Sequence, residues 1–224
     1  MKLILLSGLD GTGRLFSPFI NSLSKKIETE SITYPIDKEL SYKALVDFVM
    51  EQLPKEEKFT LLAESFSGYI AYQIALLKPK NLKSLIFVAT FLENPRPLLS
   101  KLLPFIPMRF ILSLPMPKLI AKNLLLGDEI LVKELQETLK EIPSKTLYFR
   151  LLEIVKLPKV TQKVKIRAIY IQATEDRIVS QRAYEVFAKL FSDIECIEVK
   201  GAHLILQESP RKSAVVVENF LKLV

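Results

Sequence analysis

Residues 59–68 have the sequence FTLLAESFSG, in which an apolar run ends at a short polar turn. The run Phe59–Ala63 predicts a buried strand. Apolar side chains then recur at helical spacing from Gly68 until Pro79 ends the pattern, which predicts a helix directly behind the turn. A strand joined to a helix in this way is the repeating unit of folds built on parallel sheets.

Ser65 is the candidate nucleophile of this turn. A strand-to-helix turn this sharp places its central residue in a strained conformation, and the residues two positions away on either side must be small. Ser65 has Ala63 and Ser67 at these positions, whereas Ser67 as the centre would have Tyr69. A serine that only caps the following helix is the alternative interpretation.

Five more apolar runs predict strands, and amphipathic segments lie between them. The runs are Leu3–Leu6, Ser31–Tyr34, Leu85–Ala89, Ala168–Ala173 and Ile194–Val199. Ser41 and the pair Ser209-Pro210 are the expected starts of two of the helices. The alternation predicts an α/β fold, with a mostly parallel sheet of about six strands flanked by helices.

Residues 93–159 interrupt this alternation. No convincing strand occurs there, and six of the 13 prolines fall within residues 95–117. A clearer helical pattern begins near residue 128. We therefore expect a helical cap, inserted into an α/β core formed by residues 1–92 and 160–224.

Composition narrows the classes of function. The chain has 224 residues, one cysteine, one histidine and a formal charge of 32 − 25 = +7. The single cysteine and histidine exclude a multi-cysteine or multi-histidine metal site. Because the lysines and arginines are scattered, we expect general surface charge rather than a face that binds nucleic acid. No apolar run approaches the roughly 20 residues of a transmembrane segment, and the short start MKLILLSG predicts a strand of a cytoplasmic protein instead of a signal peptide.

Glycine is scarce, and three of the six glycines follow the first strand. Gly8, Gly11 and Gly13 do not fit the spacing G-x-G-x-x-G, and no lysine–serine or lysine–threonine pair completes a Walker loop. Two interpretations remain. One is a tight strand-to-helix turn, and the other is a loop that presents a free backbone N–H to a developing anion.

A carboxylate and the only histidine follow two later strands. Asp176 lies in the turn after the fifth predicted strand, and His203 lies in the loop after the sixth. The order Ser65, Asp176, His203 is nucleophile, acid and base, each just past the end of a strand. Because the carboxyl ends of parallel strands meet at one edge, we expect the three side chains to converge. Glu175 is the alternative acid.

In these motifs the sequence resembles a small member of the α/β-hydrolase fold superfamily, over nearly the whole chain. The matching segments are the oxyanion loop GLDGTG from Gly8, the elbow AESFSG from Ala63, the acid turn EDRIV from Glu175 and the histidine loop GAH from Gly201. The loop and elbow resemble esterases, lipases and thioesterases. The acid and histidine turns are also similar to those of carboxylesterases that cleave pimeloyl-carrier-protein methyl ester. The sequence departs from the pattern where Ser7-Gly8 replaces the frequent His-Gly and where the elbow lacks both glycines.

The motifs and this resemblance predict a serine hydrolase of carboxylic esters or thioesters that needs no metal and no cofactor. Ser65 attacks the carbonyl carbon, His203 transfers the proton, and Asp176 orients the imidazole. The backbone N–H groups of Phe66 and Leu9 are the expected oxyanion donors.

The composition of the predicted cap indicates the substrate. Residues 93–127 are rich in Leu, Ile, Phe, Met and Pro, which favours an apolar acyl pocket below them. The segment has one acidic residue and five cations, which are Arg96, Lys101, Arg109, Lys118 and Lys122. Such a basic rim would attract an acidic acyl carrier protein or an anionic lipid surface. An acyltransferase with the same triad and a non-catalytic binding member of the fold are the competing hypotheses.

Overall fold

The computed structural model describes residues 1–97 and 129–224, and it confirms the α/β fold class. Six strands form one sheet in the order β2-β1-β3-β4-β5-β6, and every neighbouring pair is parallel. The strands are β1 (Lys2–Leu6), β2 (Thr29–Ile32), β3 (Phe59–Glu64), β4 (Leu82–Val88), β5 (Arg167–Ala173) and β6 (Ile194–Val199). Each predicted run lies within about three residues of a strand at both ends.

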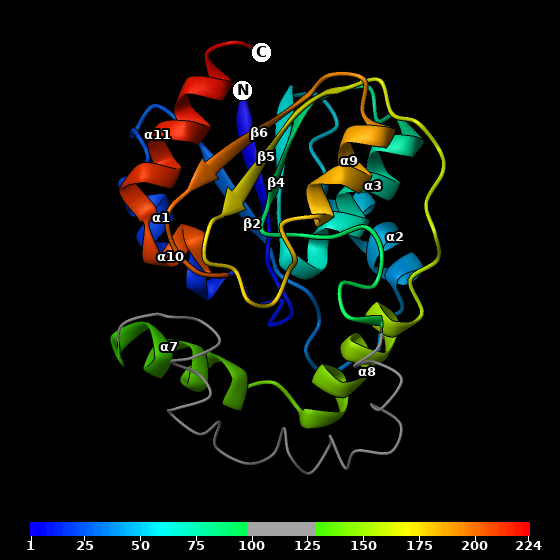
Figure 1. Cartoon of the computed structure of the whole chain (residues 1–224), viewed down its shortest axis with the longest axis vertical. Helices are drawn as coiled ribbons and strands as arrows, with labels where there is room; N and C mark the ends of the chain where they lie inside the picture. Colours follow the sequence, from blue (N-terminus) through cyan, green and yellow to red (C-terminus); the bar gives the residue numbers. More distant parts are fainter. Residues whose placement is uncertain (98–128) are drawn as a thin grey trace.

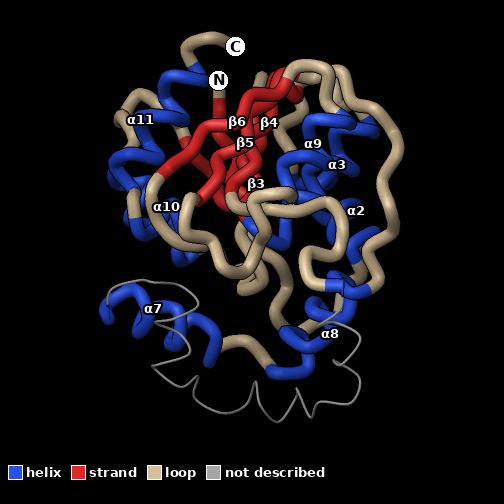
Figure 2. Tube along the Cα trace, in the orientation of Figure 1, coloured by secondary structure: helices blue, strands red, loops and turns tan. Residues whose placement is uncertain are grey.

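Helices cover both faces of this sheet, as Figures 1 and 2 show. One face carries α1 (Ser17–Ser22), α10 (Ile205–Glu208) and α11 (Pro210–Leu221). The other face carries α2 (Tyr42–Gln52), α3 (Gly68–Leu77) and α9 (Ala183–Leu190). The two short turns η1 (Arg14–Phe16) and η2 (Ser65–Ser67) follow β1 and β3.

The central strands are mostly apolar because both faces of the sheet are covered. Every residue of β3 is buried, and Leu61 and Leu62 pack into the cores on opposite faces. On the α9 side, the ring centroid of Phe87 lies 4.6 Å from that of Phe187 and 5.3 Å from that of Phe191. The strand that ends directly before Ser65 is therefore held by a packed core on each side.

The two predicted helix starts differ in how they are built. The hydroxyl of Ser41 accepts a hydrogen bond from the backbone N–H of Ala44 at 3.3 Å, which confirms it as the N-cap of α2. Ser209 precedes α11, which begins at Pro210 as predicted. The Ser209 hydroxyl, however, donates to the carbonyl of Lys200 at 3.1 Å and does not cap the helix.

Two helices of the predicted cap region lie beyond the carboxyl ends of the strands. They are α7 (Glu129–Lys140) and α8 (Ser144–Val155), and Figure 1 shows both on the side of the sheet where the strands end. Leu131 and Leu135 of α7 pack against Leu15 and Leu204 of the core. The division of the chain at residues 93 and 159 stays a prediction, because most of the first half of the cap lies outside the described residues.

Candidate active site

The turn after β3 places Ser65 in the left-handed region, as the elbow motif predicts. Its φ is 49°, a value that residues other than glycine rarely adopt. Ala63 and Ser67 are fully buried on either side, which leaves no space for larger side chains. The Ser67 hydroxyl donates to the carbonyl of Ser7 and lies 2.5 Å from the hydroxyl of Tyr34. These contacts fix the elbow to the loops that follow β1 and β2.

Gly68 begins α3 with ordinary helical dihedrals, φ −59° and ψ −41°, so its backbone alone does not require glycine. A Cβ built at this position would clash with Oγ1 of Thr90 and lie 2.8 Å from its Cγ2 and 2.9 Å from its Cβ. The Thr90 hydroxyl donates to the carbonyl of Ser65. Glycine therefore leaves the space in which Thr90 holds the elbow.

We expect the Gly68→Ala variant to lower the free energy of unfolding by about 2 kcal/mol through overpacking, although alanine is intrinsically better in a helix. Urea unfolding measures this loss. The same substitution should cost less in a Thr90→Ala background, because Oγ1 and Cγ2 of Thr90 are then absent and only its Cβ remains. Additive losses in the double variant would contradict the contact between Gly68 and Thr90.

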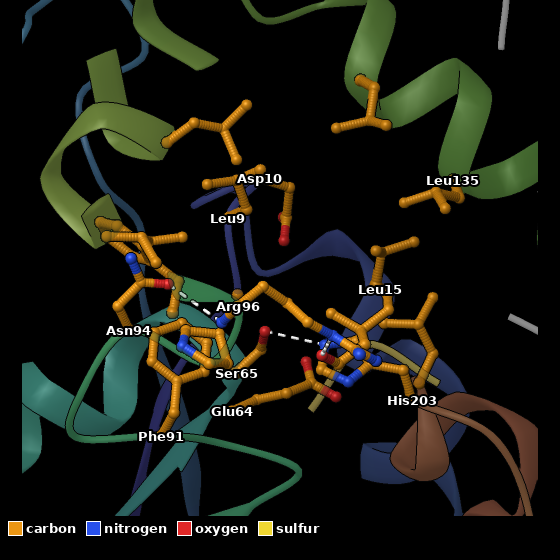
Figure 3. Close-up of a pocket in the computed structure, with 18 of the residues that line it drawn as sticks. Leu9, Asp10, Leu15, Glu64, Ser65, Phe91, Asn94, Arg96, Leu135 and His203 are labelled. Carbon is orange, nitrogen blue, oxygen red and sulfur yellow. Dashed lines mark hydrogen bonds between the residues drawn. The ribbon is translucent and has the colours of Figure 1, made fainter. Parts of the chain in front are cut away.

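The structure brings the three predicted side chains of the triad together. Ser65 Oγ lies 2.8 Å from His203 Nε2, and His203 Nδ1 lies 2.8 Å from Asp176 Oδ2. The side chains of His203 and Asp176 are 6% and 4% exposed. They follow β3, β6 and β5, whose ends meet at one edge of the sheet, and Figure 3 shows the contact between Ser65 and His203.

Asp176 is held so that one oxygen faces the histidine. Its Oδ1 accepts hydrogen bonds from the backbone N–H groups of Ile178 at 2.8 Å and Val179 at 2.9 Å. This leaves Oδ2 for His203. Glu175, the alternative acid, is exposed, so the carboxylate on the histidine is that of Asp176.

The two predicted oxyanion donors line the same pocket as Ser65. Leu9 lies in the loop after β1, and Phe66 directly follows Ser65. Within the described part of the chain, the backbone N–H of neither residue has a hydrogen-bond partner. The carbonyl of Gly8 accepts from the N–H of Gly11 at 3.1 Å, which closes the loop into a tight turn. Two free N–H groups that line the same pocket as the Ser65 hydroxyl are suited to stabilise an oxyanion.

The pocket in front of Ser65 has a volume of about 360 Å³ and almost entirely apolar walls. Helix α7 contributes Leu135 and Leu139, and α8 contributes Leu151 and Ile154. Figure 3 shows Leu135 across the pocket from Ser65. The helices of the predicted cap region therefore form one side of the pocket.

Arg96 also lines this pocket, and it is the one cation of the predicted basic rim among the described residues. Its guanidinium donates to the carbonyl of Ile178 at 3.1 Å and to that of Arg177. These bonds attach Arg96 to the acid turn. The other four predicted rim residues, Lys101, Arg109, Lys118 and Lys122, lie outside the described residues, so the rim stays a prediction.

Directly before Ser65 lies a buried carboxyl, that of Glu64, which none of the sequence motifs predicts to be part of the site. Glu64 is 2% exposed, and its Oε2 accepts from Nε2 of Gln207 at 3.3 Å. Its Oε1 has no hydrogen-bond partner among residues 1–97 and 129–224. Burial, and secondly the charge of Asp10, raises the pKa of Glu64 to about 8, against the opposing effect of Gln207. The only feature of the sequence that could have indicated this buried carboxyl is an acidic residue at the end of an apolar strand.

Residues 1–97 and 129–224 contain no group of three His, Cys, Asp or Glu side chains placed to hold a metal ion. None of their helices has both the length and the apolar character needed to cross a membrane. Burial raises the pKa of the Cys196 thiol to about 11, which makes it a poor nucleophile at neutral pH.

Comparison with solved structures gives neighbours that cover almost the whole chain. An esterase from Thermogutta terrifontis is 15% identical with a TM-score of 0.79, over 99% of this chain and 89% of that one. The enol-lactonase from Burkholderia xenovorans LB400 is 11% identical with a TM-score of 0.78, over 99% and 91%. A lipase-esterase related protein from Clostridium acetobutylicum ATCC 824 is 16% identical with a TM-score of 0.78, over 98% and 93%. Identities this low show the fold alone.

Comparison of the sequence itself gives the family. No curated protein matches it. Residues 41–210, which are more than half of the chain, match the model of a family described as serine aminopeptidase, S33. The parallel six-stranded sheet and the structural neighbours agree with this match. The chain therefore belongs to the serine aminopeptidase S33 family of the α/β-hydrolase superfamily.

Proposed function

We propose that this hydrolase-family protein is a serine hydrolase that cleaves a carboxylic ester or thioester through an acyl-enzyme. The observation that carries the proposal is the pair of 2.8 Å contacts that join Ser65, His203 and Asp176 beside the pocket. A hydroxyl, an imidazole and a buried carboxylate in this order are the groups that activate a serine as a nucleophile.

The proposed reaction uses each of these groups in turn. His203 takes the proton of Ser65 as Oγ bonds to the substrate carbonyl carbon, while Asp176 keeps the proton of the imidazole on Nδ1. The N–H groups of Leu9 and Phe66 meet the negative oxygen of the tetrahedral intermediate, and each lowers the barrier by about 3–4 kcal/mol. His203 then protonates the leaving alcohol or thiol as its bond to carbon breaks. Water, deprotonated by the same imidazole, finally releases the acid.

The apolar walls support an acyl group as the part of the substrate that enters the pocket. The structural neighbours named as an esterase and an enol-lactonase agree with ester chemistry on this fold. We propose a small acyl ester or thioester as the substrate. Recognition of an acyl group carried by an acidic acyl carrier protein would depend on the five cap cations. Of these, only Arg96 lies among the described residues.

A fluorophosphonate probe tests the nucleophile directly. We expect the wild-type protein to be labelled on Ser65, as mapped by mass spectrometry of its peptides, and to hydrolyse chromogenic acyl esters. The Ser65→Ala variant is the matched control and should show neither reaction. Label on another residue, or equal ester turnover by the two proteins, would refute the proposed function.

A panel of substrates distinguishes ester hydrolysis from thioester hydrolysis, peptidase activity and acyl transfer. Acyl esters of increasing chain length and an acyl thioester measure the preferred acyl group. An aminoacyl anilide is included because the family takes its description from a serine aminopeptidase. Product analysis with an added alcohol or amine acceptor distinguishes hydrolysis from acyl transfer.

A further inference from the structure

Arg150 carries a buried charge beside the oxyanion loop, the segment Gly8–Gly13. It lies on α8 and is 2% exposed. Its Nη1 donates to the carbonyls of Leu9 and Asp10, each at 2.7 Å, and its Nη2 donates to the carbonyl of Pro35 at 3.2 Å. The acceptors are three backbone carbonyls, so the guanidinium orients peptide groups of the loops after β1 and β2.

The loop is shaped to receive this guanidinium. Gly11 has a φ of 69°, and a Cβ built there would lie 2.6 Å from Nη1 of Arg150. The ring centre of Tyr34 lies 5.8 Å from the Arg150 Cζ. Burial of a charge is costly unless it is hydrogen-bonded, and here the bonds are supplied by the loop itself. Loop and arginine therefore depend on each other for their conformation.

Three successive carbonyls of the loop have fixed partners. That of Gly8 accepts from the N–H of Gly11, and those of Leu9 and Asp10 accept from Arg150. A peptide group is planar and trans, so fixing the Gly8 carbonyl also fixes the direction of the Leu9 N–H in the same plane. The Leu9 carbonyl fixes the next plane. The two dihedrals of Leu9 lie between these planes, of which the Gly11 N–H holds the first and Arg150 holds the second.

We propose that Arg150 is a positioning residue of the oxyanion hole, which holds the Leu9 peptide so that its N–H faces the oxyanion formed at Ser65. This inference rests on the proposed function, because the Leu9 N–H matters only if a carbonyl reacts there. Helix α8 also supplies Leu151 and Ile154 to the pocket wall. One helix thus connects the wall that contacts the acyl group to the loop that stabilises the transition state.

Helix α8 offers a matched control for this proposal. The hydroxyl of Thr146 donates to the carbonyl of Ile36 at 2.7 Å and so attaches the same helix to the loop after β2 through a bond that does not involve the oxyanion loop. The Thr146→Val variant removes that bond and keeps the shape of the side chain. A loss caused merely by loosening α8 should appear in Thr146→Val, whereas a loss of oxyanion stabilisation should appear only at Arg150.

The experiment compares ester hydrolysis by wild type, Arg150→Met, Arg150→Lys and Thr146→Val. We expect Arg150→Met to lower kcat by about 10- to 100-fold with KM nearly unchanged, because the interaction strengthens only in the transition state. Arg150→Lys, which keeps the charge and can reach one carbonyl, should lose less. Thr146→Val should keep the wild-type kcat. In an Arg150→Ala variant, added guanidinium far below denaturing concentration should restore part of kcat, and urea at the same concentration should not.

Hydrogen exchange adds a readout that does not need activity. The Gly11 amide bonds to the Gly8 carbonyl inside the loop, so its exchange should quicken in Arg150→Met and Arg150→Lys and stay unchanged in Thr146→Val. Wild-type kcat in both arginine variants, or equal losses in Arg150→Met and Thr146→Val, would overturn the proposal while Ser65→Ala still shows that the serine reacts. If wild type is as inactive as Ser65→Ala, the proposed function fails, and unchanged Gly11 exchange would then separately refute the role of Arg150.

Discussion

Changing Asp176 to asparagine should lower kcat for ester hydrolysis by about 10⁴-fold while the protein keeps its fold. The reason lies in the two backbone N–H groups, of Ile178 and Val179, that donate to Oδ1 of Asp176. They select the amide oxygen of an asparagine for that position. The amide NH₂ must then face Nδ1 of His203.

An NH₂ group at this place reverses the tautomer of the histidine. It donates to Nδ1, so the imidazole proton moves to Nε2, which faces Ser65 at 2.8 Å. An Nε2–H can no longer accept the serine proton, although every heavy atom stays where it was. The geometry around Asp176 therefore predicts a loss of proton transfer without a loss of substrate binding, and KM should change little.

Glu175, the exposed residue next to Asp176, supplies the control for this measurement. Glu175→Gln removes the alternative acid and should leave kcat within about twofold of wild type, as is usual for a surface change. Steady-state kinetics on a chromogenic ester and thermal unfolding of both variants complete the test. An asparagine variant that retains most of the wild-type kcat would show that Asp176 does not orient the reacting imidazole.

The fold and the convergence of Ser65, Asp176 and His203 could be predicted because their signals are local in the sequence. Small residues around Ser65 specify the elbow, and its positive φ follows from the short strand-to-helix turn. Asp176 and His203 follow from the position of each loop after a strand, since parallel strands end at one edge. None of these inferences needs knowledge of which helix packs on which residue.

Glu64 and Arg150 could not be predicted because their environment comes from distant segments. Glu64 meets Gln207, 143 residues later, and Arg150 meets Asp10, 140 residues earlier. An arginine on an amphipathic helix is normally at the surface, and nothing in the sequence of α8 distinguishes this one. The hydroxyl of Ser209 is a smaller example, since its bond to Lys200 depends on how the loop before α10 returns to α11.

Removing the carboxyl at position 64 should make the protein more stable at alkaline pH. The pKa of Glu64 is raised from 4.5 to about 8 in the folded chain, chiefly by burial. A carboxyl whose pKa is higher in the folded state binds more protons there than in the unfolded state, so stability falls as the pH rises from about 4.5 to 8. The shift corresponds to a loss of roughly 3–5 kcal/mol over that window.

The Glu64→Gln variant keeps the shape of the side chain and cannot ionise. Near pH 4 the two proteins should unfold at similar urea concentrations, because Glu64 is then mostly neutral in both the folded and the unfolded state. Above pH 8 the free energy of unfolding of the variant should exceed that of the wild type by most of the roughly 3–5 kcal/mol. Titrating groups distant from Glu64 contribute equally to both proteins, so their contributions cancel when the free energies are subtracted. Asp10, whose charge raises the pKa of Glu64, is coupled to it, and its share belongs to the measured difference.

The exposed Glu51 provides the comparison that isolates burial. Glu51→Gln removes the same charge from the surface and should change stability by less than about 0.5 kcal/mol at every pH. A difference between wild type and Glu64→Gln that stays constant from pH 4 to pH 9 would mean that Glu64 is ionised at neutral pH. A charged Glu64 would then sit one residue from Ser65 and repel the oxyanion that the Leu9 and Phe66 N–H groups are proposed to stabilise. A neutral Glu64 avoids this repulsion.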